Sequence, residues 1–271
     1  MQNKSLQYKK RNIHYRISGT GNPVILLHGF GEDGHIWDKI TDGLQNDYHL
    51  IIPDLPGSGE SDLLEGENIS IEDYAEVIKA IVDAEKYDCV VMIGHSMGGY
   101  ITLAFSEIYP LLLNGFGLFH SSVFADDEQK KQTRHKAIEF IKVNGAYSFL
   151  KTSIPNLFAG KMHLKEMETL IEKGKNFTSE TLIQYYNAMI NRLDRTEIVK
   201  KFSKPVLFII GEKDNAVPLD VSLLQSHLPA ISYVHILDTG HMGMIEESAA
   251  SQNIIKAFLQ NIVNLLPLVK Q

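Results

Sequence analysis

Short runs of consecutive apolar residues recur along this chain, and they constrain its fold more than any other feature. Longer segments with apolar residues at helical spacing separate them. The runs are "VILLH" (24–28), "HLIIPD" (49–54), "CVVMIG" (89–94), "GFGLFH" (115–120), "PVLFII" (205–210) and "SYVHIL" (232–237). A short run that is apolar throughout is typical of a strand buried on both faces. Buried strands that alternate with helices predict a parallel sheet with helices on both faces.

Weaker signals extend this pattern toward both ends of the chain. Residues 5–18 alternate loosely between apolar and polar residues and predict two strand-like pieces. Helical spacing appears over residues 71–86, in the segment after Ser96, and over residues 248–266. These helices lie between or after the buried strands, as a layered α/β arrangement requires.

The alternation stops between about Ser121 and Lys201. This region has no apolar run typical of a buried strand, and three of its segments have the spacing of amphipathic helices. They are "DDEQKKQTRHKAIEFIKV", "LKEMETLIEKG" and "SETLIQYYNAMINRL". An insertion of about 80 residues is too long for a simple loop. We therefore expect a helical cap over residues 121–201, inserted into a core domain made of residues 1–120 and 202–271.

Composition and charge exclude several classes of protein. The chain has 271 residues, 44% of them hydrophobic, and a formal net charge of −7, with basic residues scattered rather than clustered. That distribution does not fit a nucleic-acid binder. No apolar run approaches the roughly 20 residues of a membrane span, and the first residues lack the apolar stretch of a secretory signal. Cys89 is the only cysteine, which favours a reducing compartment. We expect a cytoplasmic protein with no nucleic-acid or membrane partner; the oligomeric state stays open.

One junction between a buried strand and a helix has an unusual composition. The stretch "VVMIGHSMGGYITLAF" (90–105) places Ser96 between Gly94 and Gly98, matching the pattern G-x-S-x-G. Glycines at these two positions let strand and helix approach closely, because they carry no Cβ atom. A tight turn there strains the serine backbone and projects its Oγ at the carboxyl edge of the sheet. The strand and helix on either side favour a nucleophile over an inert serine in a glycine-rich turn.

A serine hydroxyl is a weak nucleophile at neutral pH and needs a base, for which imidazole is well suited. Of eleven histidines, His241 follows the last strand-like run and opens the loop before the terminal helix. We expect that loop at the same sheet edge as Ser96; the alternative is a surface histidine with no chemical role. We expect His28 to hold the loop network together and His95 to pack.

The histidine needs an acceptor that fixes its tautomer and stabilises the imidazolium. "IIGEKDNAVP" (209–218) supplies Asp214 just beyond a buried strand, again at the carboxyl edge. The resulting chain order of serine, acid and histidine is the one expected for a strand-turn-helix nucleophile. Glu212 is the nearest competitor but sits closer to the strand end. An acid after the strand 115–120 is a further option, although Asp126 and Asp127 lie several residues beyond the end of that strand.

The oxyanion of an acyl-transfer intermediate needs two donors placed where charge develops in the transition state. One is expected to be the backbone N–H of Met97, directly after the nucleophile. The other is expected from the loop "HGFGEDG" after the strand 24–28, through the N–H of Phe30. Gly29 and Gly31 let that backbone turn toward the site.

Taken together, these motifs resemble the α/β-hydrolase superfamily in its lidded, esterase-like branch. The resemblance covers nearly the whole chain, with five motifs in the family's order and at typical spacings. They are "HGFGEDGHIW", "DLPGSGES", "GHSMGG", "GEKDNAVP" and "GHMGMIEE". It implies the α/β-hydrolase fold, with a mostly parallel eight-stranded sheet, helices on both faces and a helical cap after the sixth strand. It also implies Ser96 as nucleophile, Asp214 as acid, His241 as base, and Phe30 and Met97 as oxyanion donors.

The expected activity is hydrolysis of a small carboxylic ester or related acyl compound through an acyl-enzyme on Ser96. Serine stands where haloalkane dehalogenases and epoxide hydrolases of this family carry aspartate, which argues against those activities. Hydrolysis of a carbon–carbon bond, a lactone or a thioester, and acyl transfer to peroxide, use the same three side chains and stay open. So does a non-catalytic, ligand-sensing role, because a fold alone does not fix function. No zinc or phosphate-binding motif is present, so we expect no metal and no cofactor.

The substrate pocket is expected between the sheet edge and the cap. His120 draws most interest there, because it ends a core strand at the catalytic edge just before the cap. Each pocket candidate has plain packing as its alternative, since aromatic and methionine side chains mostly fill cores. Besides Phe30, the candidates are Trp37, His120, Ser121, Phe124, Phe158, Met242 and Met244.

Overall fold

An eight-stranded sheet forms the centre of the molecule. The computed structural model describes residues 1–160 and 162–265. The strands are β1 (Gln2–Tyr8), β2 (Arg11–Ser18), β3 (Asn22–Leu27), β4 (Tyr48–Pro53), β5 (Val90–His95), β6 (Leu113–Phe119), β7 (Val206–Gly211) and β8 (Ser232–Leu237). Their order is β1-β2-β4-β3-β5-β6-β7-β8. The pairs β1–β2 and β2–β4 are antiparallel and the remaining pairs are parallel, so the carboxyl ends of β3 to β8 meet at one edge.

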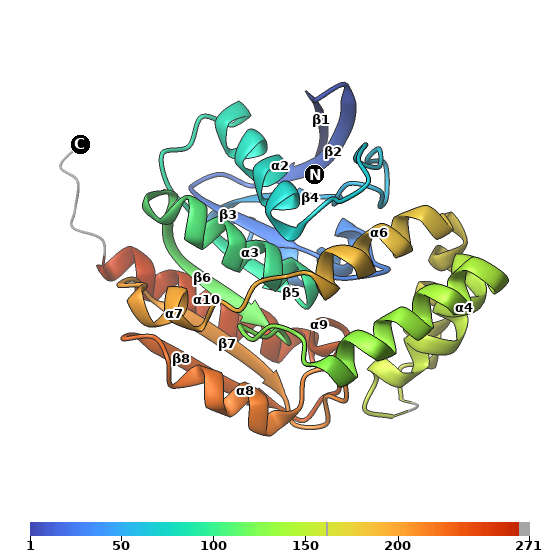
Figure 1. The fold of residues 1–271 in the computed structure, drawn as a ribbon. Helices are drawn as coiled ribbons and strands as arrows, with labels where there is room; N and C mark the ends of the chain where they lie inside the picture. The colour runs from blue at the N-terminus through green and yellow to red at the C-terminus, as the bar shows by residue number, and fades with distance from the viewer. Residues whose placement is uncertain (161, 266–271) are drawn as a thin grey trace.

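Helices cover both faces of this sheet. In Figure 1, α2 and α3 lie side by side in front of the strands, and α10 lies behind them. The core helices are α1 (Asp38–Thr41), α2 (Ile71–Ala84), α3 (Met97–Ile108), α7 (Thr196–Lys201), α8 (Leu219–Ser226), α9 (Gly243–Glu246) and α10 (Ser248–Leu265). A capping box at Ser70 and Asp73 starts α2, since each side chain bonds the backbone N–H of the other residue.

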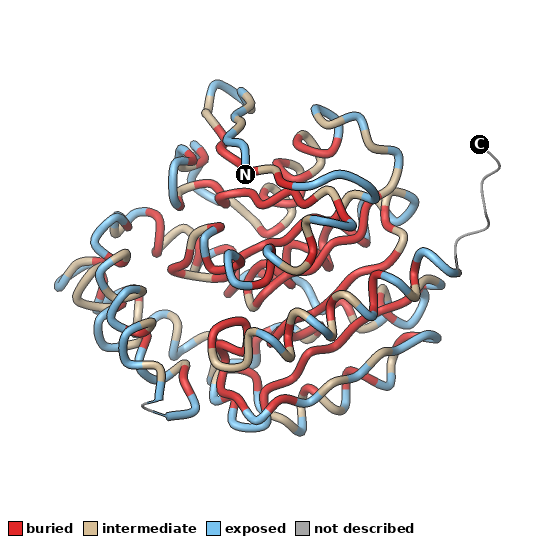
Figure 2. Tube along the Cα trace, turned by 180° about the vertical axis from the view of Figure 1, so that it is seen from behind, coloured by how far each residue is buried: buried red, intermediate tan, exposed pale blue. Residues whose placement is uncertain are grey.

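The segment between β6 and β7 is helical and extends beyond the carboxyl edge of the sheet (Figure 1). Its main elements are α4 (Glu128–Ser153), the 3₁₀ turn η3 (Ile154–Leu157), α5 (Leu164–Lys173), the 3₁₀ turn η4 (Gly174–Asn176) and α6 (Ser179–Ile190). Gly145 breaks α4 with φ 84° and ψ 162°, which allows the helix to bend over the edge. Figure 2 shows burial concentrated in the strands, whereas α4 and α5 are mostly exposed or half-buried.

The chain returns to the core through α7, which packs on α3. Arg195, just before α7, is buried and pairs with Glu72 of α2 and Glu107 of α3. The backbone N–H of Arg195 also donates to the carbonyl of Val123, 2.9 Å away, on the strand-to-cap connection. The two ends of the insertion are therefore tied to each other and to the core.

The strands expected from apolar runs all form, to within one or two residues, and β1 and β2 occupy the loosely alternating stretch 5–18. One expectation was wrong. The run 232–237 is not buried on both faces: its exposure alternates along β8. β8 is the last strand of the sheet, and the face that carries Ser232, Val234 and Ile236 is exposed there. Within the described residues, no helix is long and apolar enough to cross a membrane.

Candidate active site

Ser96 occupies a strained turn between β5 and α3. Its backbone has φ 50° and ψ −114°, a region that non-glycine residues rarely adopt, at a cost of about 1–3 kcal/mol. Hydrogen bonds hold the turn on both sides. Its N–H donates to the carbonyl of Phe119 in β6 at 3.0 Å, and its carbonyl accepts from the Ser121 hydroxyl at 2.8 Å. The serine is thus fixed at the carboxyl edge, at the N-terminus of α3.

The two glycines of the motif leave no room for a side chain. A Cβ at Gly94 would lie 2.2 Å from the carbonyl oxygen of Gly98. A Cβ at Gly98 would lie 2.6 Å from the carbonyl oxygens of Leu27 and His28. Real Cβ atoms do not approach backbone atoms this closely, so the strand, the helix and the neighbouring strand meet only because both residues are glycine.

His241 and Asp214 are in direct contact on neighbouring loops. Asp214 follows β7, His241 follows β8, and the distance from His241 Nδ1 to Asp214 Oδ2 is 2.8 Å. Burial raises the pKa of Asp214, but the imidazole of His241 beside it outweighs burial and lowers that pKa to about 2. An ionised carboxylate only accepts hydrogen bonds, so Nδ1 of His241 carries the proton. The lone pair of Nε2 is then left to act as a base.

Backbone and side-chain contacts fix the position of Asp214. Its Oδ1 accepts the N–H groups of Ala216 at 2.7 Å and Val217 at 2.9 Å. His120 approaches its Oδ2 to 3.5 Å through Nδ1, while His120 Nε2 accepts the N–H of Gly243 at 3.3 Å. Burial lowers the pKa of His120 well below its usual value, so this ring is neutral at pH 7. His120 therefore sits behind the acid as a neutral neighbour.

The loop after β3 lies directly against the serine. A Cβ at Gly29 would be only 3.1 Å from Ser96 Cβ, and Gly31 has φ +70°, which favours glycine. His28 holds this loop to the next one, because its Nε2 accepts the backbone N–H of Leu55 at 2.9 Å and lies 2.8 Å from the Ser58 hydroxyl. The segment that carries Phe30 is therefore next to the nucleophile.

A buried ion pair joins the same loop to the histidine loop. His95 Nδ1 lies 3.0 Å from Glu32 Oε2, and His95 Nε2 lies 2.9 Å from the backbone carbonyl of His241. Both partners are acceptors, so both ring nitrogens must donate and the ring is an imidazolium. Glu32 also accepts the N–H of Gly29 at 2.7 Å. His95, expected to pack rather than to take part in chemistry, is buried and connects the elbow to both flanking loops.

Ser96 and His241 open into one cavity of about 820 Å³ beneath α4 and α6. Phe30 lines it too, and its ring contacts those of Tyr186, Tyr185 and Phe149, with the Tyr186 centroid 4.4 Å away. The 3₁₀ turn η3 closes one side, where the Leu157 carbonyl accepts the N–H of His241 at 2.6 Å. Such a volume suits a small organic molecule.

Comparisons with known proteins fit this geometry. A family model of the alpha/beta hydrolase fold matches residues 22–136. A thermophilic esterase from Thermogutta terrifontis superposes with a TM-score of 0.89 at 24% identity, covering 97% of this chain and 99% of that one. Lipase 3 of Moraxella sp. (strain TA144) is 27% identical over 245 residues, which cover 88% of this chain and 78% of that protein. This chain has the α/β-hydrolase fold.

A second relative broadens the range of chemistry among similar proteins. 3-Oxoadipate enol-lactonase 1 of Acinetobacter baylyi (strain ATCC 33305 / BD413 / ADP1) is 23% identical over 261 residues, covering 93% of this chain and 94% of that protein. The fold class predicted from the sequence is confirmed. The chain has the mostly parallel eight-stranded sheet, the helices on both faces and the helical insertion after the sixth strand.

The predicted pocket residues fall into two groups. Phe30 and Phe124 line the cavity with Ser96. The others do not line it, because they pack beneath or beside it. Ser121 bonds the Ser96 carbonyl, His120 backs Asp214, and the remaining buried side chains are Trp37, Phe158, Met242 and Met244. Among the acid candidates, Glu212 is exposed and Asp126 pairs with Arg134 and Arg192, not with His241.

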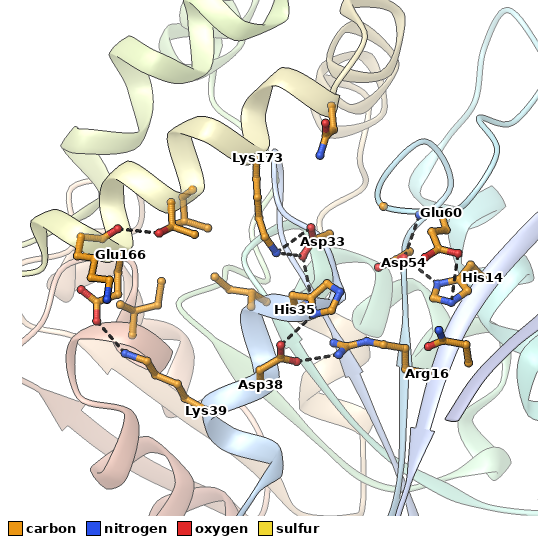
Figure 3. A pocket seen from close by; sticks show the side chains of 18 residues that line it. His14, Arg16, Asp33, His35, Asp38, Lys39, Asp54, Glu60, Glu166 and Lys173 are labelled. Atoms are coloured by element: carbon orange, nitrogen blue, oxygen red, sulfur yellow. Dashed lines mark hydrogen bonds and ion pairs between the residues drawn. The ribbon is translucent and has the colours of Figure 1, made fainter. Parts of the chain in front are cut away.

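A second cavity, of about 780 Å³, lies between α5 and the segment that contains η1 (Gly34–Trp37) and α1. Figure 3 shows its charged lining, with ion pairs that reach from the cap to the core. Lys173 of α5 pairs with Asp33 at 3.0 Å, and Lys39 of α1 pairs with Glu166 at 3.0 Å. Ser96 and His241 do not line this cavity, so it is separate from the candidate active site.

Proposed function

We propose that this α/β-hydrolase is a serine hydrolase that cleaves a small carboxylic ester through an acyl-enzyme on Ser96. The contact that carries the proposal is the one between His241 and Asp214, next to a strained serine that opens into the same cavity. A carboxylate that holds Nδ1–H leaves Nε2 free to take a proton, which is what a serine nucleophile requires.

In the acylation step, Ser96 Oγ forms a bond to the ester carbonyl carbon while its proton passes to His241 Nε2. The negative charge on the carbonyl oxygen is stabilised by the N–H groups of Met97 and Phe30. The carbon–oxygen bond to the alcohol then breaks, and the proton on Nε2 goes to the leaving oxygen. Alcohol departs and an ester to Ser96 remains.

In the deacylation step, a water oxygen attacks the same carbonyl carbon and gives its proton to His241 Nε2. The bond from the acyl carbon to Ser96 Oγ breaks, and the proton returns to Oγ. The sum of the two steps is ester plus water to carboxylic acid plus alcohol. Asp214 stays ionised throughout and stabilises the imidazolium formed in each step, consistent with its pKa of about 2.

Ester bonds are the favoured substrates because lipases and esterases are among the most similar proteins, and Lipase 3 covers most of this chain. Lactone opening is the second candidate, favoured by the similarity to an enol-lactonase along 93% of the chain. A lactone is a cyclic ester, so both candidates use the same two steps. They differ only in whether the leaving oxygen stays attached to the acyl group.

The test is turnover of 4-nitrophenyl acetate by the purified protein and by Ser96→Ala. We expect Ser96→Ala to lower kcat/KM by at least a thousandfold, because the three side chains act as a unit. The matched control is Ser106→Ala, since Ser106 is a buried serine on α3 and, among the described residues, bonds only the Leu103 carbonyl. It should keep turnover within twofold. Full turnover in Ser96→Ala would remove the serine from the reaction, and no turnover in the wild type would favour a ligand-sensing protein.

A further inference from the structure

One wall of the cavity that holds Ser96 carries a buried cluster of three charges. Asp126 lies on the connection from β6 to α4, Arg134 lies on α4, and Arg192 follows α6. Arg134 Nε is 2.5 Å from one carboxylate oxygen of Asp126, and Arg192 Nη1 is 2.7 Å from the other. The side chain of Asp126 is 0% exposed and that of Arg192 is 2% exposed. Two cations thus share one anion away from bulk water.

The cluster carries an excess positive charge, which lowers the pKa of a neighbouring tyrosine. Arg192 lies 4.0 Å from the ring centroid of Tyr100 on α3. Burial raises the pKa of the Tyr100 phenol, but the positive charges of Arg192, Lys130 and Arg134 outweigh burial and lower that pKa below its usual value. Asp127 also lines the cavity, but it is exposed and caps the N-terminus of α4. The buried part of this wall therefore favours an anion.

The two arginines are used differently. Arg192 donates to the backbone carbonyls of Met189 at 3.1 Å and Phe124 at 2.7 Å, so its guanidinium ties the two ends of the cap together. Within the described residues, Arg134 contacts Asp126 and, through Nη1, only the sulfur of Met189 at 3.5 Å, which is a weak acceptor. Its side chain keeps 13% exposure and lines the cavity. The Nε of Arg192 has no partner among the described residues but is fully buried, so Arg134 is the one whose N–H groups can reach a ligand.

Two aromatic rings connect Arg134 with the reacting centre. Tyr186 of α6 has its ring 4.4 Å from that of Phe30 and 5.7 Å from the guanidinium carbon of Arg134. On α3, Tyr100 lies one helical turn beyond Ser96 and also lines the cavity. Ser96 and Arg134 line the same cavity, so one small molecule can reach both the serine and the guanidinium.

We propose that Arg134 binds a carboxylate on the substrate, so that the site takes esters that carry a negative charge several bonds from the scissile carbonyl. This inference rests on the proposed function and names its substrate class. A guanidinium binds a carboxylate through two parallel N–H···O bonds, which fixes orientation as well as charge. The competing interpretation is that the cluster only fastens the cap.

The first experiment compares matched pairs of esters on the wild type. In one pair the charge is on the acyl side: the 4-nitrophenyl half-ester of glutaric acid against its methyl-capped diester. In the other it is on the alcohol side: 4-acetoxybenzoate against its methyl ester. We expect the charged member of at least one pair to have a 10- to 100-fold higher kcat/KM, chiefly through KM, as hydrogen bonds to charged groups allow. Equal or lower values for both charged esters would overturn the proposal.

The second experiment uses variants at one position. Arg134→Gln should lower the charged-to-neutral ratio of kcat/KM by about the same 10- to 100-fold, and Arg134→Lys should keep part of it. The matched control is Lys131→Gln on the same helix, which removes an equal charge from a residue that pairs with Glu128 and does not line the cavity. It should keep the wild-type ratio. An unchanged ratio in Arg134→Gln would assign Arg134 to fastening the cap alone.

A binding measurement separates this inference from the proposed reaction. Calorimetry should show that Ser96→Ala binds the glutaric half-ester at least tenfold more tightly than the capped diester. Raised salt should reduce this difference in affinity. This measurement needs neither turnover nor an Arg134 variant that folds. Preferential binding without any turnover in the wild type would keep the carboxylate site and reject the hydrolase reaction. Turnover of neutral esters without preferential binding would do the opposite.

Discussion

At the scale of single residues, protonation states around the serine follow from which atoms face each other. Burial alone raises the pKa of Glu32 and lowers that of His95, but their mutual attraction and hydrogen bond reverse both effects. The pKa of Glu32 is therefore lowered and that of His95 is raised. Nearby charged or titratable groups are His28 on the Glu32 side and Asp214 on the His95 side.

The sign of the pH dependence follows from these directions. Glu32 stabilises the folded state above its ordinary pKa of 4.5, and this is lost as pH falls through its lowered folded pKa. His95 stabilises the folded state below its ordinary pKa of 6.5, and this is lost as pH rises through its raised folded pKa. Both contributions are fully present between pH 4.5 and 6.5.

Glu32→Gln should lower the free energy of unfolding at pH 6 by about 3–5 kcal/mol, because it leaves a buried imidazole without its counter-charge. It should also flatten the loss of stability from pH 6.5 to 9, since His95 is then already neutral. Urea unfolding at a series of pH values measures both effects. Glu168→Gln, at an exposed glutamate of α5, is the control and should behave as the wild type. Wild-type stability of Glu32→Gln at pH 6 would refute the charged pair.

At the scale of elements, the close packing of β5 against α3 around Ser96 requires glycine, which has no side chain, at positions 94 and 98. Gly94→Ala should destabilise the protein by about 3 kcal/mol, because its Cβ would meet backbone that cannot move independently. Gly160→Ala is the control, since a Cβ there meets no atom of the described residues within 4 Å. Thermal unfolding compares the two variants. Equal midpoints would mean that the turn tolerates a wider approach of β5 and α3.

Helix α5 is held to the core across the second cavity by ion pairs (Figure 3). Lys173→Gln should speed amide hydrogen exchange over residues 164–173, while lowering global stability by less than about 1 kcal/mol, as partly exposed pairs do. Lys175→Gln is the control, because among the described residues Lys175 forms an ion pair only with Glu172, within the cap. Unchanged exchange in Lys173→Gln would show that the Lys173–Asp33 pair does not fasten α5.

At the scale of the whole molecule, the sequence allowed the layered fold to be predicted because buried strands carry a strong pattern. Runs such as 24–28 and 205–210 are apolar on both faces, and one class of architecture buries them that way. The same pattern overestimated the burial of residues 232–237, because composition does not tell which strand lies at the edge.

The candidate site was predictable where loops follow strands and unpredictable where the cap contributes. Asp214 and His241 could be predicted to meet because parallel strands end at one edge. Arg134 and Tyr186 lie on amphipathic helices of the cap. The orientation of these helices over that edge depends on the bend at Gly145 and on the contacts that hold the two ends of the cap to the core. The only sequence signal for the role of Glu32 was its place in "HGFGE", and its partner, His95, is distant in the sequence.

The most direct test of the account is the rate at which a fluorophosphonate labels the protein, with the labelled residue identified by peptide mass spectrometry. The account predicts a single label at Ser96, with the rate reduced at least a hundredfold in His241→Gln and in Asp214→Asn, because the hydroxyl then loses its oriented base. The control is Glu212→Gln, because Glu212 is an exposed acid that follows β7, as Asp214 does. This variant should label at the wild-type rate. A label on another residue, or wild-type labelling in His241→Gln, would contradict it.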